Sequence, residues 1–209
     1  AARLARSREY RFCFVLPEGD NVFMTGLERE IAAHTQHLAA DRVIADVTHT
    51  DVFDAAQLAR TLDGIEGYDG VAVVALDHPR VREAVNGLVA RGTHVATLVS
   101  DVPGAAHSHF VGIDNSAAGR TAATLMGRFL GSRKGKVAVI AGALALRDHA
   151  ERHFGFLQVL GQEHGHLQLL PVREERDSSP RAAQATRELL KQHPDLVGLY
   201  NVGAGTDGI

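Results

Sequence analysis

Two short segments, Val71-Ala72-Val73-Val74 and Val137-Ala138-Val139-Ile140, are apolar without the alternation that marks a half-exposed strand. Strands of this kind are buried on both faces, as in parallel sheets covered by helices on each side. Outward from these segments, short apolar runs alternate along the whole chain with longer amphipathic ones. This is the pattern of repeated strand–helix–strand units, so the sequence predicts an α/β protein with parallel sheets.

The expected elements follow from two periodicities. Helical segments are those in which apolar residues recur three and four positions apart, as at Val81, Val85 and Leu88. Strands are expected near residues 11–16, 42–47, 70–76, 93–99, 109–113, 136–141, 167–172 and 196–202. Helices are expected near residues 22–39, 52–63, 79–91, 115–131, 148–164 and 180–193. Asp114 suits the start of a helix, and Gly92 suits the end of one.

The alternation breaks once, at residues 101–108, where two strand patterns are joined without a helix. We expect this linker to divide the chain into two αβα lobes, residues 10–104 and 105–209. Residues 1–9 are expected to be a basic linker. Because the second lobe ends soon after a strand, where another helix is expected, the C-terminal part of the fold is expected to be missing from this chain.

The composition excludes several classes of protein. With 45% hydrophobic and 22% charged residues, the chain has the balance of a soluble globular protein. No apolar stretch approaches the ~18 residues of a membrane span, and the N-terminus lacks the apolar segment of a signal peptide. Cys13 is the only cysteine, which excludes a disulfide within the chain and favours a reducing, cytoplasmic location.

The charge is distributed unevenly along the sequence. The net charge is −3, but four arginines against Glu9 give the first eleven residues a charge of +3 and leave −6 for the rest. Aromatic residues make up 5% and Trp is absent, so stacking platforms for bases are scarce. The body of the chain is therefore not expected to bind nucleic acid.

No constellation of residues indicates catalysis or metal binding. Among the twelve histidines, His149 and His153 lie four apart but lack further ligands at metal-site spacing, so scattered surface histidines are expected. No Gly-x-Ser-x-Gly motif is present, and Cys13 lies within a strand pattern rather than at a helix start. Residues 203–208 formally match the dinucleotide fingerprint, but they follow the last strand rather than the first. The hypothesis of a nucleotide-dependent enzyme would rest on this turn alone. We therefore predict a protein without catalytic residues, cofactor or metal.

Candidate binding residues follow the strands, because open α/β sheets bind ligands beyond the carboxyl ends of their strands. Asn21 and Phe23 follow the first strand and offer an amide and a flat apolar wall; the alternative is a helix cap with a core aromatic residue. Asp101 follows the fourth strand and suits ligand hydroxyls, although a turn or hinge role is equally open. Arg152 follows the sixth strand, where its planar fork suits hydroxyls or a carboxylate. Taken alone, it is more typical of a solvated surface charge.

Three segments in sequence carry a family resemblance: Val111-Gly-Ile-Asp-Asn-Ser-Ala-Ala-Gly-Arg-Thr-Ala-Ala-Thr-Leu-Met, then Gly135-Lys-Val-Ala-Val-Ile-Ala-Gly, then Arg152-His-Phe-Gly-Phe. In this order they resemble LacI/GalR-type regulators and the related periplasmic ribose-binding proteins, over nearly all of residues 10–209. The resemblance implies a type I periplasmic-binding-protein fold. In that fold a small polar ligand, here a sugar or a derivative, lies between two αβα lobes.

The resemblance also implies which residues contact the ligand. By position these are Asn21, Phe23, Asp101, Arg152, Asn201 and Gly203. Two positions depart from the family pattern. Where many sugar binders have Asp-Arg at the first crossing, this chain has Asp101-Val102, and where they commonly have Asn-Asp after the later strand it has Gly203-Ala204. The sugar class is therefore not specified by the resemblance.

Two roles are compatible with this resemblance, since one fold serves both. The first is a cytoplasmic, homodimeric effector domain of a transcription repressor or activator. Its operator DNA would be contacted through an upstream headpiece, to which the basic linker would lead. The alternative is an exported, periplasmic sugar-binding protein of a transporter. The basic residues 1–9 and the lone Cys13 favour the regulator.

Overall fold

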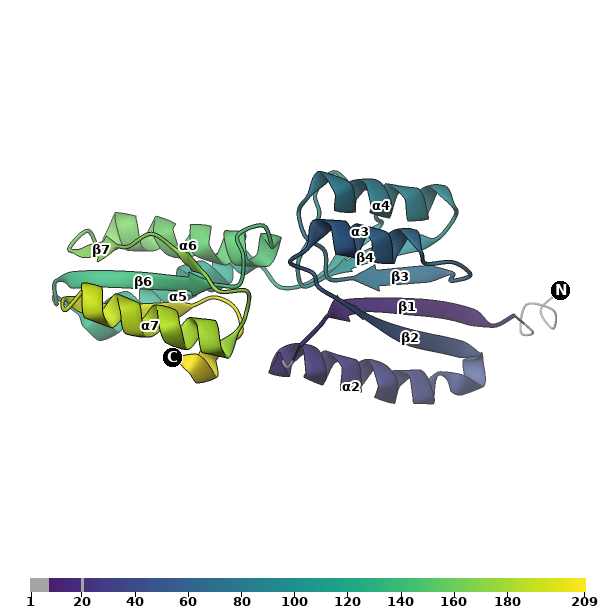
Figure 1. The fold of residues 1–209 in the computed structure, drawn as a ribbon, viewed down its shortest axis with the longest axis horizontal. Helices are drawn as coiled ribbons and strands as arrows, with labels where there is room; N and C mark the ends of the chain where they lie inside the picture. Colours follow the sequence, from purple (N-terminus) through teal and green to yellow (C-terminus); the bar gives the residue numbers. More distant parts are fainter. Residues whose placement is uncertain (1–7, 20) are drawn as a thin grey trace. The chain divides into compact units, whose positions relative to one another are not determined.

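The computed structural model describes residues 8–19 and 21–209, and most of the basic segment at residues 1–9 lies outside these ranges. The chain divides into two compact units, the first ending at Gly112 and the second beginning at Ile113. Each unit has helices packed on a parallel sheet (Figure 1). The α/β class predicted from the sequence is confirmed.

The first unit is built on a five-stranded parallel sheet of order β2-β1-β3-β4-β5. Its elements are β1 (Tyr10–Pro17), α2 (Val22–His37), η1 (Ala39–Asp41), β2 (Val43–Thr50), α3 (Ala55–Asp63), β3 (Gly70–Val73), α4 (Pro79–Ala90), β4 (His94–Leu98) and β5 (His109–Val111). Helices α3 and α4 lie on one side of the sheet and α2 lies on the other (Figure 1). Val71 and Val73 are almost fully buried, as expected of a central strand covered on both faces.

The boundary between the units differs from the one predicted. The helix-free segment at residues 101–108 joins two neighbouring strands of one sheet, because β5 pairs in parallel with β4, Thr97 opposite Phe110. These hydrogen bonds place β5 in the first unit, so the division falls at Gly112 rather than residue 104. The absence of a helix marked a short strand-to-strand connection and not the crossing between units.

The second unit is centred on β6, which pairs in parallel with β7, β8 and β9. Its elements are α5 (Asn115–Leu130), β6 (Gly135–Ala141), α6 (Arg147–Glu163), β7 (Leu167–Leu169), β8 (Arg173–Glu174), α7 (Ser179–Gln192), β9 (Leu196–Asn201) and η2 (Thr206–Gly208). The strand expected at 167–172 is shorter in the structure: β7 ends at Leu169, and β8 begins only at Arg173, beyond the expected range. Pro171 lies in the gap, where its missing N–H cannot continue a ladder.

Strand β6 explains how this unit folds. Its residues Val137 and Val139 pack into a cluster with Phe156 of α6, whereas Ala138 and Ile140 pack on the opposite face against α7. All four strand residues are at most 1% exposed. The non-alternating apolar sequence is thus buried on both faces, as predicted.

Helices α5 and α6 approach each other at two glycines. A side-chain carbon added at Gly119 would collide with the backbone carbonyl of Arg152, and one added at Gly155 would collide with that of Ser116. Close backbone approach of this kind is possible only where no Cβ intervenes. The two glycines therefore set the distance between the helices, and with it the position of Arg152 on α6.

Most helix ends agree with the sequence. Asp114 caps α5 by accepting a hydrogen bond from the Ala117 amide at 2.8 Å, and Gly92 follows α4 with φ +88°. Helix α3 starts at Ala55 rather than residue 52, because Asp54 caps it through the amides of the next turn. Within the described ranges, no helix is both long and apolar enough to cross a bilayer.

Candidate ligand-binding site

Arg152 lies at the carboxyl ends of the strands of the second unit. Its Nε donates to Asn115 Oδ1 at 2.9 Å and its Nη1 donates to the Val202 carbonyl at 3.0 Å. The side chain is 22% exposed, so the alternative of a solvated surface charge is wrong. These contacts join the first residue of α5 and the second turn of α6 to the residue that follows β9. Direct contact of Arg152 with a ligand stays a prediction.

Two buried titratable residues lie one turn before Arg152. The Asp148 side chain is 5% exposed; its Oδ2 lies 3.8 Å from Arg152 Nη2 and 3.6 Å from His149 Nε2. His149 Nδ1 accepts from the amides of Gly142 and Ala143 at 3.2 and 3.3 Å. Nδ1 is therefore unprotonated, and the ring proton is on Nε2, facing Asp148. The expectation of surface histidines is wrong for His149.

The turn after β9 brings Asn201 and Gly203 close to Arg152. The Asn201 amide nitrogen donates to the carbonyls of Gly203 and Ala204 at 3.2 and 3.0 Å, which closes the turn. Asp177 accepts from the Ala204 amide at 3.1 Å. A Cβ on Gly203 would collide with this carboxylate, which would have to move to admit it. The glycine-rich stretch therefore acts as a packed turn.

In the first unit, Asn21 and Phe23 lie together at the start of α2. Asn21 Oδ1 accepts from the amides of Phe23 and Met24 at 3.0 and 3.4 Å, so the helix-cap interpretation is confirmed. Phe23 is 61% exposed, which makes the alternative of a core aromatic residue wrong. An exposed aromatic ring at the carboxyl end of β1 fits an apolar wall for a ligand.

Asp101 follows β4 and holds a turn. Its Oδ1 accepts from Thr97 Oγ1 at 2.7 Å and from the Val102 amide at 2.8 Å, and His107 Nε2 lies 3.0 Å away. The turn role is therefore confirmed for this oxygen. Just before it, Val99 has φ +63°, a strained conformation for a β-branched residue. A ligand contact by Asp101 stays a prediction.

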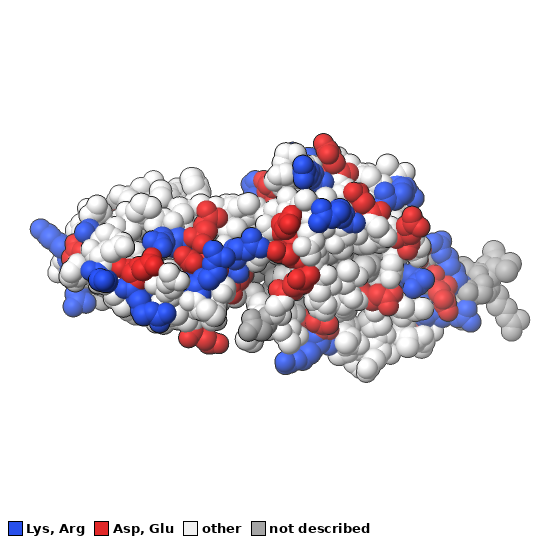
Figure 2. All heavy atoms as spheres, viewed as in Figure 1, with Lys and Arg blue, Asp and Glu red and all other residues white. Residues whose placement is uncertain are grey.

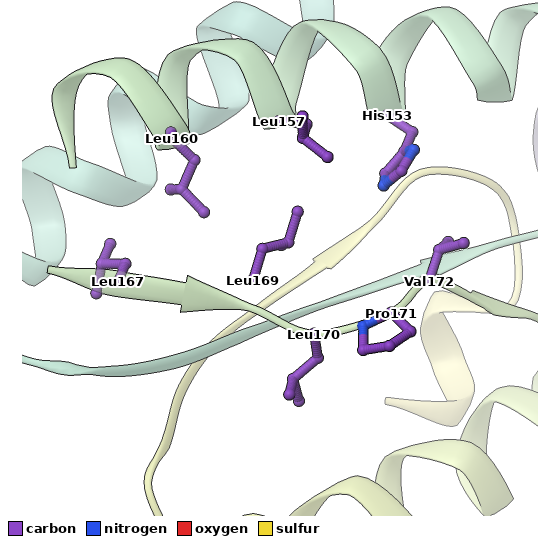
Figure 3. Close-up of a pocket in the computed structure, with 9 residues that line it drawn as sticks. His153, Leu157, Leu160, Leu167, Leu169, Leu170, Pro171 and Val172 are labelled. Atoms are coloured by element: carbon purple, nitrogen blue, oxygen red, sulfur yellow. The ribbon is translucent and has the colours of Figure 1, made fainter. Parts of the chain in front are cut away.

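A separate hollow of about 390 Å³ lies between α6 and β7 (Figure 3). It is lined by His153, Leu157, Leu160, Gly161, Leu167, Leu169, Leu170, Pro171 and Val172. Burial lowers the pKa of His153, the one titratable side chain in this lining. Sites for polar ligands need several converging hydrogen-bonding groups, which this leucine-rich surface lacks. The polar cluster around Arg152 is therefore the better candidate.

Within the described part of the chain, no group of three or more His, Cys, Asp or Glu side chains is placed to hold a metal ion. Figure 2 shows acidic and basic side chains interspersed on the face in view, without a continuous basic surface. Cys13 is buried in β1, and burial raises the pKa of its thiol, which disfavours the reactive thiolate.

Sequence reasoning missed four residues of the cluster. Asn115 was interpreted only as the start of a helix, and Asp148, His149 and Asp177 were not considered binding residues. One signal was visible: Asp148 precedes Arg152 by four positions, the spacing that brings opposite charges together on a helix. The partners Asn115 and Asp177 come from other elements, and no local pattern points to them.

Two α/β units with parallel sheets are the architecture of the type I periplasmic-binding-protein fold. Residues 12–208 match the family model described as the periplasmic binding protein domain, and the chain belongs to this family. No curated protein matches the sequence.

Solved structures with the same fold are distant in sequence. A glucose-galactose binding protein, GanP, from Geobacillus stearothermophilus is 24% identical with a TM-score of 0.85, over 96% of this chain and 70% of that one. An ABC transporter solute-binding protein from Burkholderia graminis, in complex with D-arabinose, is 22% identical with a TM-score of 0.85, over 94% and 67%. Another from Agrobacterium vitis, bound with α-D-tagatopyranose, is 17% identical with a TM-score of 0.85, over 96% and 70%.

Proposed function

We propose that this chain is a sugar-binding domain that takes its ligand at the carboxyl ends of its strands and catalyses no reaction. The observation that carries the proposal is the Arg152 cluster, where Arg152, Asn115 and the turn after Asn201 converge from three elements of a periplasmic-binding-protein fold. Arginine and amide groups suit ligand hydroxyls. The sugar complexes among the compared structures support the same ligand class.

The test is thermal unfolding of the full-length protein in a screen of sugars, polyols and sugar acids. A ligand that binds only the folded state stabilises it by about 2.7 kcal/mol at a hundredfold excess over the dissociation constant. We expect at least one compound to raise the melting temperature in a concentration-dependent way. A flat response across the whole screen would contradict the proposed function.

Two roles remain for such a domain, and each has its own support. The compared structures include solute-binding proteins of ABC transporters, which favours an exported protein that delivers sugar to a transporter. The LacI/GalR resemblance at residues 111–126, together with the four arginines of the first eleven residues, favours a cytoplasmic, homodimeric effector domain of a regulator. In that role the ligand would change the spacing of two DNA-binding headpieces.

A gel-shift titration at physiological salt separates the roles. For a regulator, we expect the full-length protein to bind operator DNA as a dimer and residues 12–209 alone to bind negligibly, since they carry a charge of −6. Base readout requires a groove-entering element, which we expect upstream. A gene product with a signal peptide and no headpiece would establish the transporter role instead. Tight, specific DNA binding by the isolated core would also contradict the regulator proposal.

A further inference from the structure

We propose that Asp148 makes the Arg152 cluster select neutral sugars and polyols over sugar acids. This inference rests on the proposed function and adds the charge class of the ligand. An arginine with no other partner at a sugar site can donate hydrogen bonds to the hydroxyl groups of a neutral sugar and to the carboxylate of a sugar acid alike. Whether the site prefers a neutral sugar or a sugar acid therefore depends on which protein groups already pair with the guanidinium of Arg152.

Most of the Arg152 guanidinium is already engaged within the protein. Nε and Nη1 donate to Asn115 Oδ1 and to the Val202 carbonyl, which leaves Nη2 as the nitrogen without a hydrogen bond in these contacts. That nitrogen lies 3.8 Å from the buried carboxylate of Asp148. An incoming ligand therefore meets an ion pair with one available edge rather than an isolated positive charge.

The cluster also lacks donors rather than acceptors. Asp148 Oδ1 and Asn201 Oδ1 are both buried, and no hydrogen-bond donor among the described residues reaches either oxygen. Both oxygens are covered by protein atoms in this structure, so a ligand hydroxyl or a water can donate to them only after neighbouring side chains shift; leaving them without a partner is costly, which favours such a shift. Hydroxyl groups can donate to these oxygens and accept from Arg152 at the same time, whereas an ionised carboxylate can only accept.

The charges around Arg152 also favour a neutral ligand over an anionic one. Asp177 accepts from the Ala204 amide beside the turn after β9, and Glu174 accepts from the Leu144 amide after β6, so carboxylates other than Asp148 also lie at this end of the unit. A ligand carboxylate that bound Arg152 Nη2 would lie close to Asp148, and like charges at short range oppose binding when water is excluded. A neutral ligand avoids this repulsion. An amino sugar, which carries a positive charge, is tolerated for the same reason.

The experiment compares affinities of matched ligands at fixed ionic strength by titration calorimetry on the full-length protein. Each neutral aldose that binds is paired with its own sugar acid and its 2-amino derivative. We expect the neutral sugar to bind at least about tenfold tighter than the acid, the scale of one unfavourable charge contact. Asp148→Asn, which keeps the size of the side chain but removes its charge, should reduce this ratio about fivefold or more, mainly by strengthening binding of the acid.

Glu151→Gln serves as the matched control, because Glu151 lies on the same helix and pairs with Arg147 at 2.7 Å instead of with Arg152. It should leave the ratio unchanged. Equal or tighter binding of the acid by the wild-type protein overturns the inference while leaving the proposed function intact, as does an unchanged ratio in Asp148→Asn. If Asp148→Asn does not fold, the wild-type ratio decides alone. Absence of binding by every sugar, acid and amino derivative overturns the proposed function and this inference together.

Discussion

Replacing Gly119 with alanine is expected to destabilise the second unit by about 3 kcal/mol or more, above the usual range for an overpacked core position. The new Cβ would collide with the backbone carbonyl of Arg152, and backbone atoms of a helix cannot move aside as a flexible side chain can. Helices α5 and α6 must then separate, which disturbs the packing of Phe156 beneath them. Denaturant unfolding followed by circular dichroism measures the loss.

A matched control is available on the same helix pair. Gly161 also lies within α6, but a Cβ added there meets nothing within 4 Å. Gly161→Ala should therefore stabilise the protein by roughly 0.5–1 kcal/mol, because alanine restricts the unfolded chain and favours helix. Gly155→Ala should resemble Gly119→Ala, since its Cβ would meet the carbonyl of Ser116. Equal stability of the three variants would show that the helices do not approach as closely as the structure indicates.

The sequence predicted the fold well wherever burial leaves a local pattern. The uninterrupted apolar residues of β6 predicted a strand covered on both faces, and Asp114 predicted the start of α5. The unit boundary was not predictable in the same way. Whether β5 belongs to the first or the second unit depends on its hydrogen bonds to β4, and a segment of three residues carries no periodicity that names its partner.

The candidate site was predictable in position but not in its contacts. Family resemblance and strand ends located Arg152 and the turn at Asn201, and the structure brings these two together. The hydrogen bond from Arg152 to Asn115 joins residues 37 positions apart and depends on helix packing set by Gly119. The environment of Phe23 was not predictable from the sequence either. An aromatic residue after a strand suits a buried core and an exposed binding surface equally well, and only the folded structure shows which of the two it occupies.

Replacing Arg152 with alanine is expected to weaken sugar binding by roughly 1.5–3 kcal/mol, the scale of a hydrogen bond from a charged group. This is about a 10- to 150-fold increase in the dissociation constant, measurable by titration calorimetry. The structure predicts a lower melting temperature as well, because Asn115 and the Val202 carbonyl lose their donor and the buried Asp148 loses its cation.

The two effects of Arg152→Ala can be separated with two further variants. Arg152→Lys retains the positive charge near Asp148 but not the planar fork, so it should recover part of the stability and little of the affinity. Arg147→Ala removes a different guanidinium of α6, one that pairs with Glu151, and it should alter binding by less than about 0.5 kcal/mol, as expected for a surface substitution. If Arg147→Ala weakens binding more than Arg152→Ala does, the guanidinium that reaches the ligand is that of Arg147. The contacts that join Arg152 to Asn115 and Val202 would then serve only to hold α5, α6 and β9 together.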